Sequence, residues 1–430
     1  MSQEENNIIE CFNLPNGNLI NKYDTFDIKD KAVTENTHII HKYPSKFIPQ
    51  IPRWAILEYS NENDIVLDPF SGSGTTVAES LINNRNGIGI DINPVARLIS
   101  KVKSTPIDPK ILKETYRQLL KNIKEDNQIK PEVIPNIPNI DKWFTEESIK
   151  NLSIFKYHIY KIEDPDVRDF FKVNLSAIIR KTSNAEYRSQ KTYVSSRFRK
   201  EPDDVFKIFD RRFNQYLNGM EQFYNSMKEN EAVGYIIQGS ADNFDKNEIM
   251  GDTFDKSYVD LAITSPPYVT AVEYPSVFKL EYQWLDYFED KEINEHRKNY
   301  IGTDRVYVNE YGNLAVFGNE NIDLKLSEIY EYDKKKSYIL YKYLIGMKNN
   351  MQCVYDVLKT NGKYVIVVGN NSVMNIEIPI SEYLIQIGEE MGYELENIFS
   401  YVIKDRHLII PRNGRGGIIN KDWVIVLNKK

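Results

Sequence analysis

Short apolar runs alternate with longer amphipathic stretches along much of this chain of 430 residues. The runs are rich in valine, isoleucine and leucine, and their lengths suit buried strands rather than helices. Strands are predicted at residues 64–68, 87–91, 235–238, 259–263 and 364–368. Residues 380–391 have apolar positions at helical spacing, and residues 398–403 with 423–427 predict a closing hairpin. This alternation predicts an α/β fold with a largely parallel sheet.

A long central part of the chain has a different pattern. Between residues 105 and 232, apolar residues recur at the spacing of amphipathic helices. These helices are predicted at residues 112–123, 149–162, 167–179 and 205–227. Prolines at positions 131, 135 and 138 exclude a continuous helix in the linker between the first two. We therefore predict a mainly helical insertion at 105–232, which divides an α/β domain into residues 1–104 and 233–430.

The loop after the first of these strands is a strong local signal for a binding site. Residues 69–74 (PFSGSG) follow the strand, and a helix is predicted to begin at Thr75, which we assign as its N-cap. Gly72 and Gly74 let a ligand approach the backbone, and a helix N-terminus favours an anionic group. The next strand ends in Asp91, whose carboxylate suits two ribose hydroxyls. The loop lacks the third glycine of the dinucleotide fingerprint, which disfavours a dinucleotide site.

A second candidate site directly follows the strand at 259–263 and has the sequence Ser265-Pro266-Pro267-Tyr268. Consecutive prolines fix the backbone and push Ser265 out of helical geometry, so the Ser265 hydroxyl and the Pro266 carbonyl become rigidly placed acceptors. Tyr268 adds a flat ring beside them. These groups suit the exocyclic amino group of an extruded base, which needs acceptors for its N–H bonds and a face for stacking. By itself, Pro-Pro-Tyr is also typical of a stiff turn.

Together, the two motifs resemble those of S-adenosylmethionine-dependent DNA amino-methyltransferases. Residues 68–76 match the cofactor-binding motif, and residues 265–268 match the catalytic motif. The resemblance implies a Rossmann-like methyltransferase sheet in which the helical insertion recognises the target. A serine before Pro-Pro-Tyr most often accompanies N4-cytosine methylation in this family. It therefore implies methyl transfer to the N4 amino group of a flipped cytosine in double-stranded DNA, with Ser265, Pro266, Pro267 and Tyr268 as catalytic residues.

Two further segments extend the resemblance. Residues 41–49 (HKYPSKFIP) are similar to the segment that closes over the methionine end of the cofactor. Residues 239–242 (GSAD) are similar to the segment whose acid receives the adenine amino group. The cofactor-binding residues implied by all these matches are Tyr43, Lys46, Phe47, Asp68, Phe70, Gly72, Gly74, Thr75, Asp91, Ile92 and Asp242.

The order of the motifs leaves the target open. Here the closing segment comes first and the catalytic loop comes late, whereas the catalytic loop precedes the cofactor motif in the commonest N4-cytosine arrangement. The alternatives are N6-adenine methylation of DNA, methylation of an amino group on RNA, and a catalytically silent DNA-binding subunit. The resemblance also names a cognate restriction endonuclease as a candidate partner.

The formal charge of −7 opposes nucleic-acid binding as a sum, but the distribution of charge matters more. Residues 180–213 hold ten basic and five acidic side chains with aromatic residues between them, which suits phosphate contacts and base stacking. The predicted DNA contacts are Arg180, Lys181, Arg188, Lys191, Arg197 and Arg199. A charged stretch of this kind is also typical of a solvated helix face. A second polar, tyrosine-rich segment at 286–333 is predicted to order only on DNA.

Composition excludes several other classes of protein. Cys11 and Cys353 are the only cysteines, which argues against a disulfide framework and a zinc site, so we predict no metal. Neither cysteine follows a proline, so the usual thiolate nucleophile of cytosine C5 methylation is missing. The N-terminus is polar and no apolar run reaches the length of a membrane span, so no membrane partner is predicted. We expect a reducing, cytoplasmic location.

Overall fold

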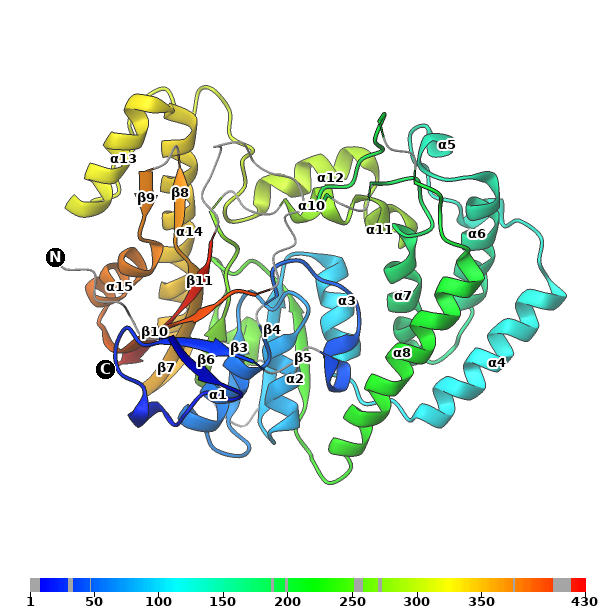
Figure 1. The fold of residues 1–430 in the computed structure, drawn as a ribbon, viewed down its shortest axis with the longest axis horizontal. Helices are drawn as coiled ribbons and strands as arrows, with labels where there is room; N and C mark the ends of the chain where they lie inside the picture. The colour runs from blue at the N-terminus through cyan, green and yellow to red at the C-terminus, as the bar shows by residue number, and fades with distance from the viewer. Residues whose placement is uncertain are drawn as a thin grey trace.

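The computed structural model describes residues 8–29, 34–46, 48–186, 189–197, 200–250, 258–269, 273–373, 376–404 and 419–430. Within these residues, a nine-stranded sheet lies at the centre and a helical body lies beside it (Figure 1). The strand order in the sheet is β1-β2-β10-β11-β7-β6-β3-β4-β5. In the same part of the chain, no helix is long and apolar enough to cross a membrane.

Every strand predicted from an apolar run is present in this sheet. The strands are β1 (Ile8–Cys11), β2 (Thr25–Ile28), β3 (Ile65–Asp68), β4 (Asn86–Asp91), β5 (Gly234–Gln238), β6 (Val259–Thr264), β7 (Leu358–Gly369), β10 (Tyr393–Val402) and β11 (Lys421–Lys429). The short strands β1 and β2 have no apolar run and were not predicted; they extend the sheet by parallel pairing beside β10. A separate antiparallel ribbon consists of β8 (Asn371–Val373) and β9 (Ile376–Ile378).

The connection order creates a switch point at the middle of the sheet. Strands β5, β4, β3, β6 and β7 run parallel, and β11 lies antiparallel between β7 and β10. After β3 the chain adds β4 and β5 on one side, and then returns to place β6 on the other side of β3. Ligands of α/β sheets bind where successive connections diverge in this way. The predicted Rossmann-like α/β fold class is confirmed by this strand order.

Alternate side chains of the central strands bury themselves on opposite faces of the sheet. On β7, Val365 and Val367 join the core beneath α1 (Gln50–Tyr59), whereas Ile366 and Val368 join the core beneath α14 (Lys334–Val357) and α15 (Ile380–Met391). This alternation follows from the two-residue period of a strand. Two more helices, α2 (Thr75–Ile82) and α3 (Pro94–Lys103), follow β3 and β4.

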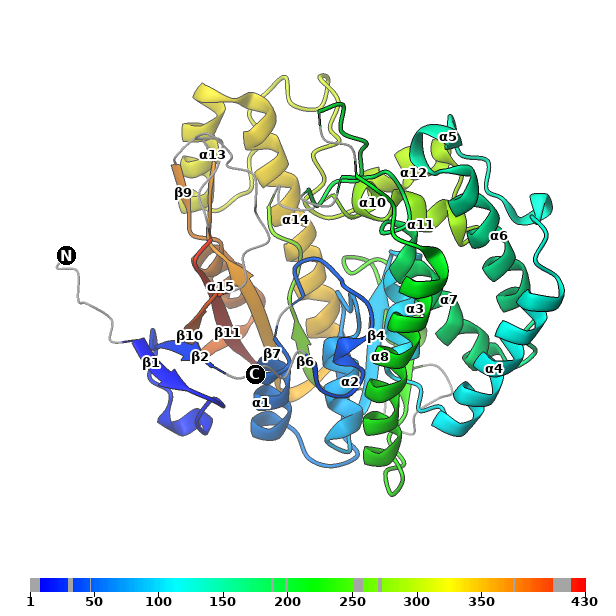
Figure 2. The same ribbon diagram turned by 45° about the vertical axis from the view of Figure 1, so that its right-hand side comes forward.

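The predicted helices of the insertion form a body beside the sheet (Figure 2). Its core is rich in aromatic side chains. They are α4 (Pro109–Glu125), α5 (Ile140–Trp143), α6 (Glu146–Tyr160), α7 (Pro165–Ile179) and α8 (Val205–Ser226). The same core also contains residues of α3 and of the short helices after β6, which are α10 (Tyr274–Val277), α11 (Lys279–Trp284) and α12 (Asp290–His296). The body therefore draws on separate parts of the sequence, and the domain boundaries at 105 and 232 stay a prediction.

The segment 286–333 contains helices that its polar, tyrosine-rich composition did not indicate, and its dependence on DNA for order stays a prediction. These helices are α12, the short η5 (Arg297–Asn299) and α13 (Glu320–Tyr332). Ile322, Leu326 and Ile329 lie on one face of α13 and are completely buried in the core that includes α14. Because these three residues recur at helical spacing, they form one apolar face, although the segment as a whole has a polar composition. The remaining short helices are η1 (Gly17–Leu19), η3 (Asn36–Ile39), η4 (Pro131–Val133) and α9 (Lys246–Met250).

Candidate active site

The carboxyl ends of β3, β4 and β6 bring the two predicted motifs together. Parallel pairing places Asp68 opposite Gly89, near the end of β4, and pairs β3 with β6 directly. The loops that follow these strands therefore leave the same edge of the sheet. The glycine-rich loop and the Ser-Pro-Pro-Tyr loop are about two hundred residues apart in the sequence and adjacent in the fold.

The two glycines of the loop have different surroundings. Both have left-handed backbone, with φ of 51° at Gly72 and 76° at Gly74, which glycine adopts without steric cost. A Cβ at Gly72 would lie 3.3 Å from Cε1 of Tyr43, and both residues line the cavity described below. A Cβ at Gly74 would lie 2.8 Å from Cα of Ser100 on α3. Gly74 is the N-cap of α2, in place of the predicted Thr75, and it allows two helices to pack closely.

Asp91 joins the end of β4 to the glycine-rich loop. Its Oδ2 accepts a hydrogen bond from the backbone N–H of Gly72 at 2.8 Å, and its Oδ1 accepts one from the N–H of Asn93 at 2.7 Å. Burial raises the pKa of this carboxyl to about 6, against the effect of these hydrogen bonds. The side chain lines the cavity, and the carboxylate keeps acceptor capacity for a further donor.

Asp68 occupies a different environment from the one predicted. It is completely buried and is not on the cavity wall. Its Oδ1 accepts hydrogen bonds from the hydroxyl of Thr264 at 2.6 Å and from the N–H of Phe70 at 3.1 Å. Because Thr264 immediately precedes the Ser-Pro-Pro-Tyr loop, Asp68 connects the two motifs through the protein interior rather than through a ligand.

A cavity of about 740 Å³, its open mouth included, lies where these loops meet. Nine of the residues predicted for the site line it, namely Tyr43, Lys46, Phe70, Gly72, Thr75, Asp91, Ile92, Ser265 and Pro267. The described residues that were predicted but do not line it are Asp68, Gly74, Asp242, Pro266 and Tyr268. Phe47 falls outside the described residues.

The segment before α1 supplies one wall of the cavity. Tyr43 stacks on Tyr274 and Phe278 with ring centroids 5.5 and 5.3 Å apart. Lys46 Nζ donates a hydrogen bond to the backbone carbonyl of His38 at 2.9 Å. Burial lowers the pKa of Lys46 to about 8, so the ammonium group is still largely protonated at neutral pH. The wall therefore combines an aromatic face with a partly buried cation.

The segment after β5 contributes Ser240 and Ala241 to the wall, whereas the predicted acid lies behind them. Asp242 accepts a hydrogen bond from the hydroxyl of Ser240. Its side chain is partly buried and does not line the cavity in this conformation. The predicted contact between Asp242 and an adenine amino group therefore stays a prediction.

The Ser-Pro-Pro-Tyr loop divides its side chains between two cavities. Ser265 and Pro267 face the first cavity, and Tyr268 lines a second one. The Tyr268 hydroxyl donates to Asp422 on β11, which also accepts from Tyr401 at 2.9 Å. Burial raises the pKa of Asp422. This interaction with a distant strand fixes the Tyr268 ring, and no local sequence signal predicts it.

The second cavity adjoins the first and has a volume of about 600 Å³, its open mouth included. Both cavities are lined by Pro267, Tyr274, Tyr300 and Ile301. Glu273, in the second, forms ion pairs with Arg297 and, at 2.7 Å, with Lys191. Burial alone raises the pKa of Glu273, but its hydrogen bonds with Lys191, Asp304 and Arg297 outweigh burial and hold the pKa low.

Several wall residues were missed by sequence reasoning. Tyr274, Asn299, Tyr300 and Ile301 come from α10, η5 and the turn after it. These positions lie in segments with few apolar residues and no recognisable motif. The only signal was the high tyrosine content of 286–333, which was interpreted as a sign of conditional order. Ser45 was missed inside a motif that was recognised.

The predicted DNA contacts fall into distinct groups. Arg180 is largely buried, and its guanidinium donates to the carbonyls of Glu186 at 2.7 Å and Gln190 at 2.9 Å. This side chain holds its own loop together, which differs from the predicted phosphate contact. Lys191 pairs with Glu273, and Arg197 is exposed. Lys181 is half-buried, with a pKa lowered chiefly by burial, and Arg188 and Arg199 lie outside the described residues.

Comparison with known proteins agrees with this arrangement. Residues 3–102, which hold the closing segment, the glycine-rich loop and Asp91, match the N6_N4_Mtase model, described as DNA methylase. This part of the chain is similar to the N6/N4 DNA amino-methyltransferases. The cofactor of this family is S-adenosylmethionine, as predicted. Which base such an enzyme methylates does not follow from this match.

Curated relatives extend the similarity beyond the matched region. The type II methyltransferase M.MvaI of Kocuria varians is 26% identical over 401 residues, which cover 86% of this chain and 84% of that protein. M.MjaII of Methanocaldococcus jannaschii is 37% identical over 136 residues, which cover 30% of this chain and 26% of that protein. Among solved structures, the rRNA methyltransferase aviRa of Streptomyces viridochromogenes has a TM-score of 0.33 at 8% identity and covers 90% of this chain and 89% of that one. That overlap supports no conclusion, and the fold assignment rests on the strand order.

Proposed function

We propose that the first cavity binds S-adenosylmethionine and that the chain is a type II DNA methyltransferase that methylates the N4 amino group of a flipped cytosine. The observation that carries this proposal is the position of Ser265 and Pro267 on the wall of the first cavity, with Pro267 also lining the second. A methyl donor in one cavity and an extruded base in the other would meet at this loop. The relatives named as type II methyltransferases support the restriction-modification setting and a cognate restriction endonuclease.

The wall of the first cavity has the chemistry that this cofactor requires. Asp91 offers free lone pairs to ribose hydroxyls, and Lys46 offers a cation to the carboxylate of the methionine part. The absence of a side chain at Gly72 keeps the space beside Tyr43 open. Phe70 adds an apolar surface for the adenine ring. When bound, S-adenosylmethionine supplies a methyl group on a positively charged sulfur.

The Ser-Pro-Pro-Tyr loop then has to orient a weak nucleophile. An exocyclic amine is weakly nucleophilic because its lone pair is delocalised into the ring. The Ser265 hydroxyl, on the cavity wall, would accept one of its N–H bonds. Pro266 is not on the wall, and the contact of its carbonyl with the second N–H stays a prediction; the two contacts together would favour a pyramidal nitrogen as the new bond forms. Tyr268, fixed by Asp422, would stack on the base and hold it in line with the methyl group. The proton leaves late to solvent, because serine is a weak base.

Base-resolved sequencing of DNA from a host that lacks other methylation and expresses this chain tests the target directly. N4-methylcytosine at a fixed sequence is the expected result. Detection of N6-methyladenine instead would mean that the target base is adenine and not cytosine. The chain would still be a DNA amino-methyltransferase. Modified RNA with unmodified DNA would overturn the DNA assignment, and a protein that binds no S-adenosylmethionine would be a silent subunit.

Two variants test the loop itself. Ser265→Ala is expected to slow single-turnover methyl transfer with little change in cofactor affinity. Tyr268→Ala is expected to remove most activity, since stacking contributes about 1–3 kcal/mol per base. Tyr401→Phe is a matched control, because it removes the other hydroxyl bound to Asp422 without touching the loop. Near wild-type rates in both loop variants would identify the segment as a structural turn.

The basic residues at 180–213 form the basic cluster of the helical body. We propose that the exposed members of this cluster contact DNA. Arg197→Ala is expected to weaken DNA binding and to reduce the slope of log K against log salt by about 0.9, as for one lost phosphate contact. S-adenosylmethionine binding should not change. Arg180→Ala is instead expected to disturb the loop at 186–191, because its guanidinium binds carbonyl oxygens there. An unchanged salt slope in Arg197→Ala would assign this cluster to a solvated face.

A further inference from the structure

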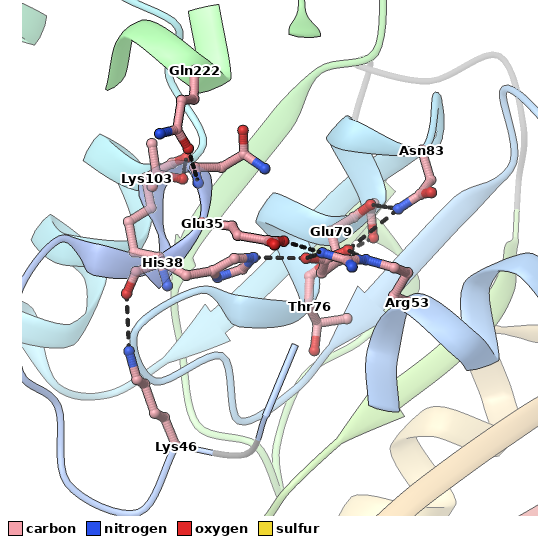
Figure 3. A network of polar contacts seen from close by, with 12 residues as sticks. Glu35, His38, Lys46, Arg53, Thr76, Glu79, Asn83, Lys103 and Gln222 are labelled. Atoms are coloured by element: carbon pink, nitrogen blue, oxygen red, sulfur yellow. Dashed lines mark hydrogen bonds and ion pairs between the residues drawn. The ribbon is translucent and has the colours of Figure 1, made fainter. Parts of the chain in front are cut away.

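A buried acid behind the cofactor cavity connects three separate elements. Glu79 on α2 is completely buried and is not on the cavity wall. Its Oε1 lies 2.7 Å from Nε2 of His38 on η3, and its Oε2 accepts from Nε of Arg53 on α1 at 2.9 Å. Figure 3 shows Glu79 between these two partners. A second bond from Arg53 Nη2 at 3.0 Å makes the guanidinium contact bidentate.

The protonation states follow from burial and partners. Burial alone raises the pKa of Glu79, but the hydrogen bonds and charges of His38 and Arg53 outweigh it, so the pKa lies below its ordinary value. Burial lowers the pKa of His38 to about 4, so this imidazole is neutral at neutral pH. Since a carboxylate only accepts, Nε2 of His38 carries the proton. The carboxylate of Glu79 therefore accepts from one charged guanidinium and from two neutral donors, the imidazole of His38 and, at 3.4 Å, the side-chain amide of Asn83.

His38 links this network to the wall of the cofactor cavity. Its backbone carbonyl accepts the hydrogen bond from Lys46 Nζ at 2.9 Å, and Figure 3 shows both bonds of His38, one to each side. Tyr43, five positions after His38, is also on the cavity wall. On the other flank, the hydroxyl of Thr37 donates to the carbonyl of Lys103 at 2.8 Å, which ties η3 to α3. Glu79 thus reaches the wall through His38.

Local backbone preference does not hold this segment in place. His41 and Ser45 have left-handed backbone, with φ of 57° and 56°. A non-glycine residue in this region costs about 1–2 kcal/mol. The bends at both positions therefore depend on tertiary contacts, such as the bond between His41 and Ser176 at 3.2 Å and the contact between His38 and Glu79.

We propose that Glu79 and His38 are positioning residues that hold the segment 41–46 in the shape that binds S-adenosylmethionine. Glu79 fixes the imidazole of His38, and the His38 carbonyl then fixes the ammonium group of Lys46. The role in cofactor binding rests on the proposed function of the first cavity. The positioning of the segment itself does not.

The test compares the full-length chain with Glu79→Gln, which keeps the size of the side chain and removes its charge. Amide hydrogen exchange at residues 34–46 is expected to become faster, because the anchor of η3 is weakened. The Kd for S-adenosylhomocysteine, measured by calorimetry, should rise about tenfold. In methylation assays the KM for S-adenosylmethionine should rise by more than kcat falls.

Asp260→Asn is a matched control for general loss of stability. Asp260 is another buried acid and lies at the start of β6, where it accepts from the N–H of Ile65 at 2.9 Å and pairs with Lys359 at 2.8 Å. It lies at the end of β6 opposite to the Ser-Pro-Pro-Tyr loop. Its variant is expected to lower the melting temperature while exchange at 34–46 and the Kd stay at wild-type values.

Substitutions of His38 provide a rescue experiment. They separate the contribution of its N–H donor from that of its side-chain volume. His38→Ala should reproduce the effects of Glu79→Gln, whereas His38→Gln keeps an N–H donor and should recover part of the affinity. The double variant Glu79→Gln with His38→Ala should bind S-adenosylhomocysteine no more weakly than the weaker single variant. Both changes remove the same contact, so their effects should not add.

Two outcomes separate the possible failures. If Glu79→Gln lowers the melting temperature but leaves exchange at 34–46 and the Kd unchanged, the positioning role is overturned. If the wild-type chain binds no S-adenosylhomocysteine while exchange at 34–46 still responds to Glu79→Gln, the proposed cofactor site fails and the positioning of the segment stands.

Discussion

Asp68 and Asp91 end two neighbouring strands of one sheet, and burial raises the pKa of each carboxyl to about 6. Their partners differ. Asp91 binds two backbone N–H groups and faces the cavity, whereas Asp68 accepts from the hydroxyl of Thr264 inside the protein. Both follow an apolar run, and both were predicted to touch the cofactor. The difference teaches that an acid at a strand end marks the edge where the cavity lies, but the neighbouring strand decides which acid faces the cavity.

The largest effect expected to separate Asp91 from Asp68 is a loss of cofactor affinity. Asp91→Ala should weaken S-adenosylmethionine binding roughly ten- to a hundredfold, since hydrogen bonds to a charged group contribute about 1.5–3 kcal/mol. Calorimetry on the purified variant measures it. Asp68→Ala is the paired control and should change affinity far less. Equal losses in the two variants would break the distinction between them.

Asp68→Ala is expected to act on folding instead. It leaves the Thr264 hydroxyl without its acceptor in a completely buried position, at a cost of about 1–3 kcal/mol in the free energy of unfolding. Denaturant unfolding measures this loss. Thr264→Val removes the other partner and should be less harmful in the presence of Asp68→Ala than alone. Additive losses would mean that this hydrogen bond is not the reason for the burial of Asp68.

The two glycines that follow Asp68 repeat the contrast. Gly74→Ala is expected to destabilise the fold, because its left-handed φ costs about 1–2 kcal/mol in a non-glycine residue and its Cβ would press on the Ser100 backbone. Gly72→Ala has the same backbone cost, but its Cβ would point across the cavity toward Tyr43. Affinity for S-adenosylmethionine should therefore fall in Gly72→Ala beyond what its melting temperature explains. A larger affinity loss in Gly74→Ala would reverse the assignment.

The smallest expected effect is a pH dependence with opposite consequences for the two acids. The pKa of Asp68 is raised from 3.8 to about 6, so between these values the folded protein keeps a proton that the unfolded chain has released. The stability contributed by this group is therefore lost as pH rises through this window. The measurement is the free energy of unfolding of wild type and of Asp68→Asn at pH 4 and pH 6. Between these pH values, wild type should lose more stability than the variant.

Cofactor binding should respond in the other direction. Ribose hydroxyls donate to the ionised form of Asp91, so affinity should increase as pH rises through about 6. Calorimetry at several pH values should show this increase in wild type and in Asp68→Asn. Its persistence in Asp91→Asn would assign the titration to another group.

Much of this molecule followed from the sequence alone. Apolar runs predicted the central strands, because five valine- and isoleucine-rich segments of strand length have few other ways to bury themselves. Helical spacing predicted α4, α6, α7 and α8. The glycine-rich loop placed Gly72 and Asp91 at one site, since a tight turn and the next strand end lie close together in any parallel sheet of this kind.

Tertiary structure decided the rest, because contacts between residues far apart in sequence leave no local pattern. Tyr300 and Ile301 reach the cavity from a segment whose composition predicted conditional order. Tyr268 is fixed by Asp422, which lies 154 positions later. Sequence reasoning predicted that the segment 41–49 belongs to a cofactor site, but only the fold shows that Glu79 reaches this segment through His38. A strand end predicts where a side chain begins, and the packing around it decides what that side chain touches.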